Sequence, residues 1–161
     1  MMRMRIAGLI TLGILAFVVV LLYAQESVVF ETYLIPSTMK EGWVTIEYGN
    51  PTCPPLKGRS RREYVIPKSG YFCTSTKRNT KWFYDWYYLV DENGKRTALV
   101  KDKQIFHRMS VFLDPLNPNP GCKNVVADVF WYGRQDKIDN QDGVALQKQH
   151  PECGGLKIPI K

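Results

Sequence analysis

From residue 28 onward, hydrophobic and polar positions alternate with a period of two rather than the 3.6 of a helix. Segment 42–49 shows this most clearly, because glycine stands at both ends and two sets of side chains alternate between them. One set is Val44, Ile46 and Tyr48, and the other is Thr45 and Glu47. Successive side chains of a strand point to opposite faces, so the pattern predicts a β-strand with one set on each face.

Other runs rich in β-branched and aromatic residues are separated by proline and glycine, which end strands and form turns. These runs cover residues 28–35, 62–66, 71–73, 83–90, 95–100, 105–113 and 125–132. Between 83–90 and 95–100 lies Asn93-Gly94, a pair that supplies the positive φ angles of a tight hairpin. No window has the spacing of a convincing amphipathic helix.

About eight short strands with turns between them describe an all-β fold better than an α/β fold. Both a sandwich and a closed barrel satisfy this spacing, and we expect an antiparallel β-sandwich. The tail after residue 135 contains several glycines and prolines and little that could be buried. We therefore expect a cysteine, Cys153, to hold it in place.

The first 24 residues have a different character. Arg3 and Arg5 precede 19 consecutive uncharged residues, Ile6 to Ala24. This layout is typical of a helix that enters a membrane with its N-terminus in the cytoplasm, so we assign residues 1–24 to a signal anchor or signal peptide. The run is longer than a usual signal core of ~7–15 residues and close to the ~20 that span a bilayer.

Residues 25–161 are then an exported domain, and the two readings of the N-terminus give two locations. An uncleaved anchor places the domain on the outer side of the cytoplasmic membrane, whereas cleavage makes it periplasmic or secreted. We expect no lipid anchor of the usual bacterial type, because the first cysteine is Cys53.

All four cysteines lie in the expected exported part, as disulfides in an oxidising compartment require. Four cysteines allow three pairings. Proximity in the sequence favours Cys53 with Cys73 and Cys122 with Cys153. Each closed loop would stabilise the domain by roughly 3 kcal/mol in the chain-entropy model.

We expect no metal and no cofactor. The cysteines form no C-x-x-C motif and the two histidines have no zinc-ligand spacing. Residues 136–143 are rich in oxygen ligands, but aligning Gly143 with the sixth position of a calcium loop places Ile138 and Gln149 where an aspartate and a glutamate are required. Motifs for serine hydrolysis, zinc proteolysis and nucleotide binding are also missing.

Composition and charge narrow the class of partner. The 161 residues are 45% hydrophobic, which argues for one folded domain, and 22 Lys and Arg stand against 15 Asp and Glu. Without Arg3 and Arg5 the excess is 20 over 15, or +5, which is too small to imply nucleic acid. We expect a membrane contact through the N-terminal helix, and a cell-wall polymer or an envelope protein as partner.

Two segments are candidates for the binding surface. In a strand, Trp82, Tyr84 and Trp86 share one face, which forms an exposed aromatic ladder if the opposite face is core. Trp131 lies in a second aromatic group. Segment 57–62 adds positive charge, and we take Arg59, Arg61 and Arg62 as candidate ligands for phosphate-bearing polyanions. The alternatives are cross-strand packing for the aromatics and a solvated loop for the arginines.

Short motifs between residues 32 and 100 carry a family resemblance. They are Leu34-Ile35-Pro36, Gly42-Trp43-Val44, Pro54-Pro55-Leu56, Ile66-Pro67, Ser69-Gly70 and Thr74-Ser75. In order and spacing they resemble a family of bacterial exported domains of unknown function. The resemblance implies a fold and brings no catalytic residues. The opening motifs are also similar to those of prealbumin-like sandwiches, which implies the same layered architecture.

These observations favour a non-enzymatic binding module of the cell envelope. A second hypothesis is an envelope enzyme acting on wall polysaccharide, with Asp85 or Asp128 as acid or base. A third is a structural subunit, which would have a broad apolar patch or an unpaired edge strand. The second hypothesis requires the two aspartates to meet in a cleft, whereas solvent-facing tryptophans would favour the first.

Overall fold

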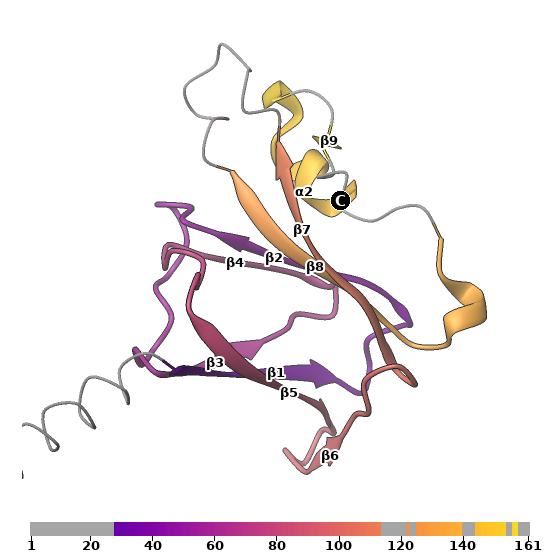
Figure 1. The fold of residues 1–161 in the computed structure, drawn as a ribbon. Coiled ribbons are helices and arrows are strands. Elements are labelled where there is room, and N and C mark those ends of the chain that lie inside the picture. The colour runs from indigo at the N-terminus through magenta and orange to yellow at the C-terminus, as the bar shows by residue number, and fades with distance from the viewer. Residues whose placement is uncertain (1–27, 114–121, 123–124, 140–143, 154–155, 158–161) are drawn as a thin grey trace, which may run out of the picture.

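The structure is a computed structural model that describes residues 28–113, 122, 125–139, 144–153 and 156–157. Two β-sheets face each other across a central core (Figure 1). The four-stranded sheet has the order β3 (Arg61–Val65), β1 (Val28–Pro36), β5 (Trp82–Val90) and β6 (Arg96–Ala98). The five-stranded sheet has the order β4 (Tyr71–Thr74), β2 (Gly42–Tyr48), β8 (Val126–Tyr132), β7 (Ile105–Leu113) and β9 (Leu156–Lys157). The expectation of an all-β, sandwich-like fold is confirmed.

The expectation that the strands are antiparallel is wrong for three pairs. Strand β1 runs parallel to both β3 and β5, and β2 runs parallel to β4. The reason is that the chain changes sheet after each of its first four strands, so β1, β3 and β5 begin at the same end of the sandwich (Figure 1). Antiparallel pairing is found for β5–β6, β2–β8, β7–β8 and β7–β9.

The predicted hairpin is confirmed between β5 and β6. The Asp91 carboxylate accepts hydrogen bonds from the backbone N–H groups of Asn93 and Lys95, at 3.0 and 2.8 Å. Gly94 adopts a φ of 79°, which a residue with a side chain rarely takes. Local turn chemistry therefore fixes this register without help from the rest of the fold.

Between the sheets, apolar and aromatic side chains form the main core. Tyr33 stacks on Tyr64 and on Tyr87, with ring centroids 4.6 and 4.9 Å apart, and Phe130 meets Tyr33 edge-on at 5.4 Å. Toward the end of the sandwich where β1 terminates, the core is aliphatic. Its members there include Ile35, Val44, Ile66 and Ile105.

The outer face of the five-stranded sheet is also buried, so both alternating sets of β2 lie inside the protein. This face carries a second core, in which Val111, Ala127 and Val129 pack with Leu146 of helix α2 (Val144–Gln149). The 3₁₀ helix η3 (Pro151–Cys153) follows α2, and another, η2 (Gln135–Lys137), follows β8. On the same face, the buried Glu47 carboxylate lies 2.9 Å from His150 Nε2 and accepts a hydrogen bond from Asn50.

Two disulfides hold the loops and the tail, in the pairing that sequence proximity favours. Cys53–Cys73 joins the segment after β2 to β4, and Cys122–Cys153 fastens the C-terminal helices to the second core. The N-terminal hydrophobic helix falls outside the described residues, so the anchor and signal readings both stay predictions. Among the residues that are described, no helix is long and apolar enough to cross a bilayer.

Strand β7 contains a β-bulge. Phe106 pairs with Trp131 and Met109 pairs with Val129, so two residues of β7, His107 and Arg108, stand opposite a single residue of β8. His107 adopts a φ of 52° and its side chain is exposed. The extra residue bends the strand and allows Arg108 to point between the sheets.

We expect the free energy of unfolding of His107→Gly to equal that of the wild type or to exceed it by up to about 1 kcal/mol, because glycine adopts positive φ without strain. His107→Val should be less stable by about 1–2 kcal/mol, since a β-branched residue is disfavoured there. Urea unfolding measures both, and equal stability of the two variants would contradict the role given to the bulge.

Candidate functional site

The interior becomes polar at the end where β1, β3 and β5 begin. Three carboxylates point into the space between the sheets there: Glu31 of β1, Asp85 of β5 and Asp128 of β8. Glu31 is 2% exposed and Asp128 is 4% exposed. Burial of three negative charges is unfavourable unless cations and hydrogen-bond donors compensate them.

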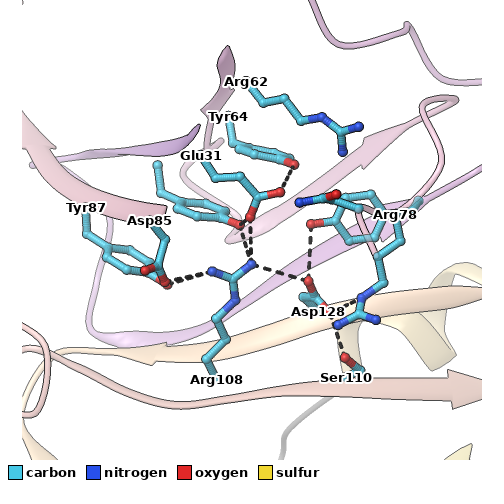
Figure 2. Close-up of polar contacts among 12 residues, drawn as sticks. Glu31, Arg62, Tyr64, Arg78, Asp85, Tyr87, Arg108, Ser110 and Asp128 are labelled. Carbon is cyan, nitrogen blue, oxygen red and sulfur yellow. Dashed lines mark hydrogen bonds and ion pairs between the residues drawn. The ribbon is translucent and has the colours of Figure 1, made fainter. Parts of the chain in front are cut away.

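Arg108 compensates them from the centre of this group (Figure 2). Its Nη2 donates to Glu31 Oε2 at 2.9 Å and to the Tyr33 hydroxyl at 2.8 Å, and its Nη1 donates to Asp85 Oδ2 at 2.7 Å. Asp128 Oδ2 lies 3.5 Å from Nη2. Since Glu31 and Asp85 belong to one sheet and Arg108 and Asp128 to the other, the guanidinium joins the two layers.

Further donors occupy the remaining oxygens. The Tyr64 hydroxyl donates to Glu31 Oε1 at 3.2 Å, and the Tyr87 hydroxyl donates to Asp85 Oδ2 at 2.8 Å. Lys101 pairs with Asp85 Oδ1. Asp128 accepts bonds from Arg78 Nε, Ser110 and Tyr48 at 2.7, 2.9 and 3.3 Å. We call these residues the charge network, in which the cations Arg78, Lys101 and Arg108 balance the three carboxylates.

This arrangement does not favour acid or base catalysis. Asp85 and Asp128 do come together around Arg108, as the enzyme hypothesis requires, but all four of their oxygens already have partners. Burial of Asp85 opposes its ionisation, yet the hydrogen bonds from Lys101, Tyr87 and Arg108 outweigh burial and hold the pKa of this carboxyl below its ordinary 3.8. A carboxyl that acts as a general acid near neutral pH needs the opposite shift.

A cavity opens beside the charge network, and we call it the basic pocket. It has a volume of about 1090 Å³ and is lined by residues of segments 56–62 and 76–81 and by Val29. Five of the lining side chains are cationic, and among the described residues that line it none is acidic. The five are Arg59, Arg62, Lys77, Arg78 and Lys81. Arg78 links the pocket to the network through Asp128 (Figure 2).

The outer face of the four-stranded sheet carries aromatic side chains exposed to solvent. Trp82, Tyr84 and Trp86 are 85%, 61% and 43% exposed. Phe30, on the neighbouring strand, stacks with Tyr84 and Trp86 at centroid distances of 5.9 and 5.6 Å. We call these four residues the aromatic row. Both alternatives considered for these aromatics therefore hold in part, because the face is exposed and its rings also pack across strands on Phe30.

Strand alternation divides the basic segment between two surfaces. Tyr64 of β3 is buried between the sheets, so Arg62, two residues earlier, lies on the inner side and reaches the basic pocket. Arg61 points to the opposite side, where its register partner is Phe30 of the aromatic row. Arg59 lines the pocket. The three candidate arginines thus do not form a single patch.

The expectation that Trp131 offers binding surface is wrong. This residue is only 4% exposed, because it packs edge-on against Trp43 on the outer face of the five-stranded sheet. Its indole N–H donates to the backbone oxygen of Arg134 at 3.1 Å. It lies in the other sheet from the aromatic row, where neighbouring residues cover it.

Sequence reasoning missed Glu31, Lys77, Arg78 and Arg108. Two of them carry a detectable signal, because Glu31 and Arg108 are charged residues within otherwise apolar strands. A charge at such a position requires a compensating partner. Lys77 and Arg78 have no such signal, since they lie in a polar connection between strands.

Comparison with known proteins assigns the chain to a family. The model of a family described as "Family of unknown function (DUF6843)" matches residues 28–117. The chain belongs to this family. The DUF6843 segment contains Glu31, Asp85, Arg108 and the aromatic row, whereas Asp128 and the Cys122–Cys153 disulfide lie beyond it.

One similar solved structure is a 2.75 Å crystal structure described as "Putative Lipoprotein from Bacillus anthracis". The two proteins are 23% identical, with a TM-score of 0.56, and the match covers 78% of this chain and 92% of the other. This likeness shows a shared fold for the DUF6843 protein. No curated protein matches it.

We expect Arg108→Leu to lower the free energy of unfolding by about 3–5 kcal/mol, because removing one member of a buried ion pair leaves carboxylates uncompensated. Arg134→Leu is the matched control. Arg134 pairs with Asp136 on the surface, where both side chains are largely exposed, and its loss should change little. Urea unfolding measures both, and equal effects would show that the network is not important for stability.

The buried tyrosines predict a loss of stability in alkali. Burial raises the pKa of Tyr64 to about 12, and burial also raises the pKa values of Tyr33, Tyr48 and Tyr87 above the ordinary 10. Above pH 10 the unfolded chain releases the protons of these hydroxyls, whereas the folded chain retains them. The free energy of unfolding therefore has its full value below pH 10 and falls as the pH rises toward 12.

Ultraviolet absorbance of tyrosinate, followed with circular dichroism, measures this effect. We expect these four tyrosines to ionise only as the protein unfolds. Ionisation of all nine tyrosines at their ordinary pKa in a protein that stays folded would contradict the burial described above.

Proposed function

We propose that this domain is a non-enzymatic binding module of the cell envelope, which holds a carbohydrate-containing wall polymer on its aromatic row. Sugar rings present C–H groups that pack on the faces of aromatic side chains, while their hydroxyls stay hydrated. A row of neighbouring aromatic rings therefore fits a chain of sugar units better than a single compact molecule.

The observation that carries this proposal is the exposure of Trp82, Tyr84 and Trp86 on a regular sheet face. Phe30 lies nearly parallel to Tyr84 and Trp86, with interplanar angles of 17° and 15°, so the rings are held in a fixed orientation before any ligand arrives. Exposed apolar groups of this size on one face are typical of interaction sites. Arg61 adds a positive charge beside Phe30.

An envelope location is supported by independent features. The two disulfides are typical of proteins outside the cytoplasm. The similar crystal structure is described as that of a putative lipoprotein. In this chain the expected attachment is the apolar run Ile6 to Ala24 instead.

Occupation of the Asp85 and Asp128 oxygens by internal partners favours binding over catalysis.

The test is retention of the full chain on purified, insoluble cell-wall polymer. Combined Trp82→Ala and Trp86→Ala substitutions should weaken retention about tenfold or more, because central aromatic residues supply much of the affinity of such surfaces. Trp82→Phe with Trp86→Phe is the matched control, which keeps a ring at both positions and should keep most of the retention.

Urea unfolding confirms that each variant is folded. Retention that the alanine variant leaves unchanged would contradict the proposal. Retention that disappears when the wall is first treated with protease would also contradict it, because the partner would then be an envelope protein rather than a polymer.

A further inference from the structure

Three of the cations that line the basic pocket, Arg59, Arg62 and Lys77, have no carboxylate partner among the described residues. Asp128 takes up the charge of Arg78, at 2.7 Å from its Nε. Arg59, Arg62, Lys77 and Lys81 line the same cavity, and no acidic residue within the described part of the chain lines it. Like charges held close together repel one another, so an anion bound between them would stabilise this arrangement.

Arg62 gives a second indication of a missing partner. Its guanidinium interacts with the Tyr64 hydroxyl, but its buried Nε has no hydrogen-bond partner among the described residues, although a buried N–H normally finds an acceptor. Its Nη1 makes one long contact, 3.4 Å, with the backbone oxygen of Lys77. A guanidinium with donors in a fixed fork is well suited to the oxygens of a phosphate group.

The size and position of the pocket indicate what carries that phosphate. A volume of about 1090 Å³ is more than a single phosphate needs and leaves room for a group attached to it. Val29 and Arg62, each the second residue of its strand, line the pocket, so it opens at the end where β1 begins. Only residues 25–27 separate the apolar run from β1, and three residues span roughly 10 Å.

We infer that the basic pocket binds the phosphate of an anionic lipid headgroup at the membrane surface. Arg62 and Arg59 supply fork-shaped donors, Lys77 and Lys81 supply charge, and Leu56 and Val29 contact the apolar part of the headgroup region. The inference that the phosphate belongs to a lipid rests on the membrane attachment included in the proposed function. The phosphate chemistry rests on the pocket alone, and neither depends on the aromatic row.

The experiment uses the full chain reconstituted in phosphatidylcholine vesicles with or without phosphatidylglycerol. A ligand that binds the folded state raises the unfolding temperature, so phosphatidylglycerol should raise it for the wild type. Lys77→Gln should remove most of this shift. Lys68→Gln is the matched control, because it removes the same charge from an exposed position at the far end of β3, and it should leave the shift intact.

Two Arg62 variants separate charge from geometry. Arg62→Gln should weaken the apparent affinity for phosphatidylglycerol about tenfold, the loss expected for one charge-assisted contact. Arg62→Lys keeps the charge but loses the fork and the buried Nε, so its affinity should fall between that of Arg62→Gln and that of the wild type.

A second arm replaces the lipid with inorganic phosphate, added to the chain in nonionic detergent at constant ionic strength. Inorganic phosphate could stabilise the protein as strongly as phosphatidylglycerol, with the same dependence on Lys77. That result would overturn the inference that the ligand is a lipid and would support a free phosphate. Absence of stabilisation in both arms, or equal losses in Lys77→Gln and Lys68→Gln, would overturn the phosphate site. Trp82 and Trp86 are unchanged throughout, so these outcomes are independent of the wall-polymer test.

Discussion

The contact between the Arg108 guanidinium and carboxylates from both sheets is the interaction on which the rest of the structure depends. Glu31 and Asp85 come from the four-stranded sheet, and Asp128 comes from the five-stranded sheet. Without this cation the polar end of the sandwich would contain three buried negative charges, and the sheets would separate there to admit water. The β-bulge that turns Arg108 inward is therefore as important as the residue itself.

Balance within the network has a consequence for the surfaces around it. Because each network carboxylate is satisfied by internal partners, none of the three lines the basic pocket, and the charged side chains that line it in the described part of the chain are all cationic. Because Tyr33, Tyr64 and Tyr87 occupy the inner face of the four-stranded sheet, the alternate residues of β5 must face outward, and these supply three of the four members of the aromatic row. One interior arrangement thus determines the character of two separate surfaces.

The sequence predicts best those features that depend on neighbours along the chain. The Asp91–Lys95 turn, the exposed face of β5 and the pairing of nearby cysteines are of this kind. Parallel pairing of β1 with β3 and β5 was not predictable, because a short turn reads the same whether the next strand stays in the sheet or crosses to the other. The position of Arg108 depends on a bulge that no turn residue marks, and the burial of Trp131 depends on a residue, Trp43, that is distant in the sequence.

Strand β8 lies between β2 and β7, yet it falls after the last residue of the DUF6843 match. A fragment ending at residue 117 would have no central strand in its five-stranded sheet, and the backbone edges of β2 and β7 would be left unpaired next to an open core. In this chain, the segment that the family model matches is therefore not a complete unit of folding.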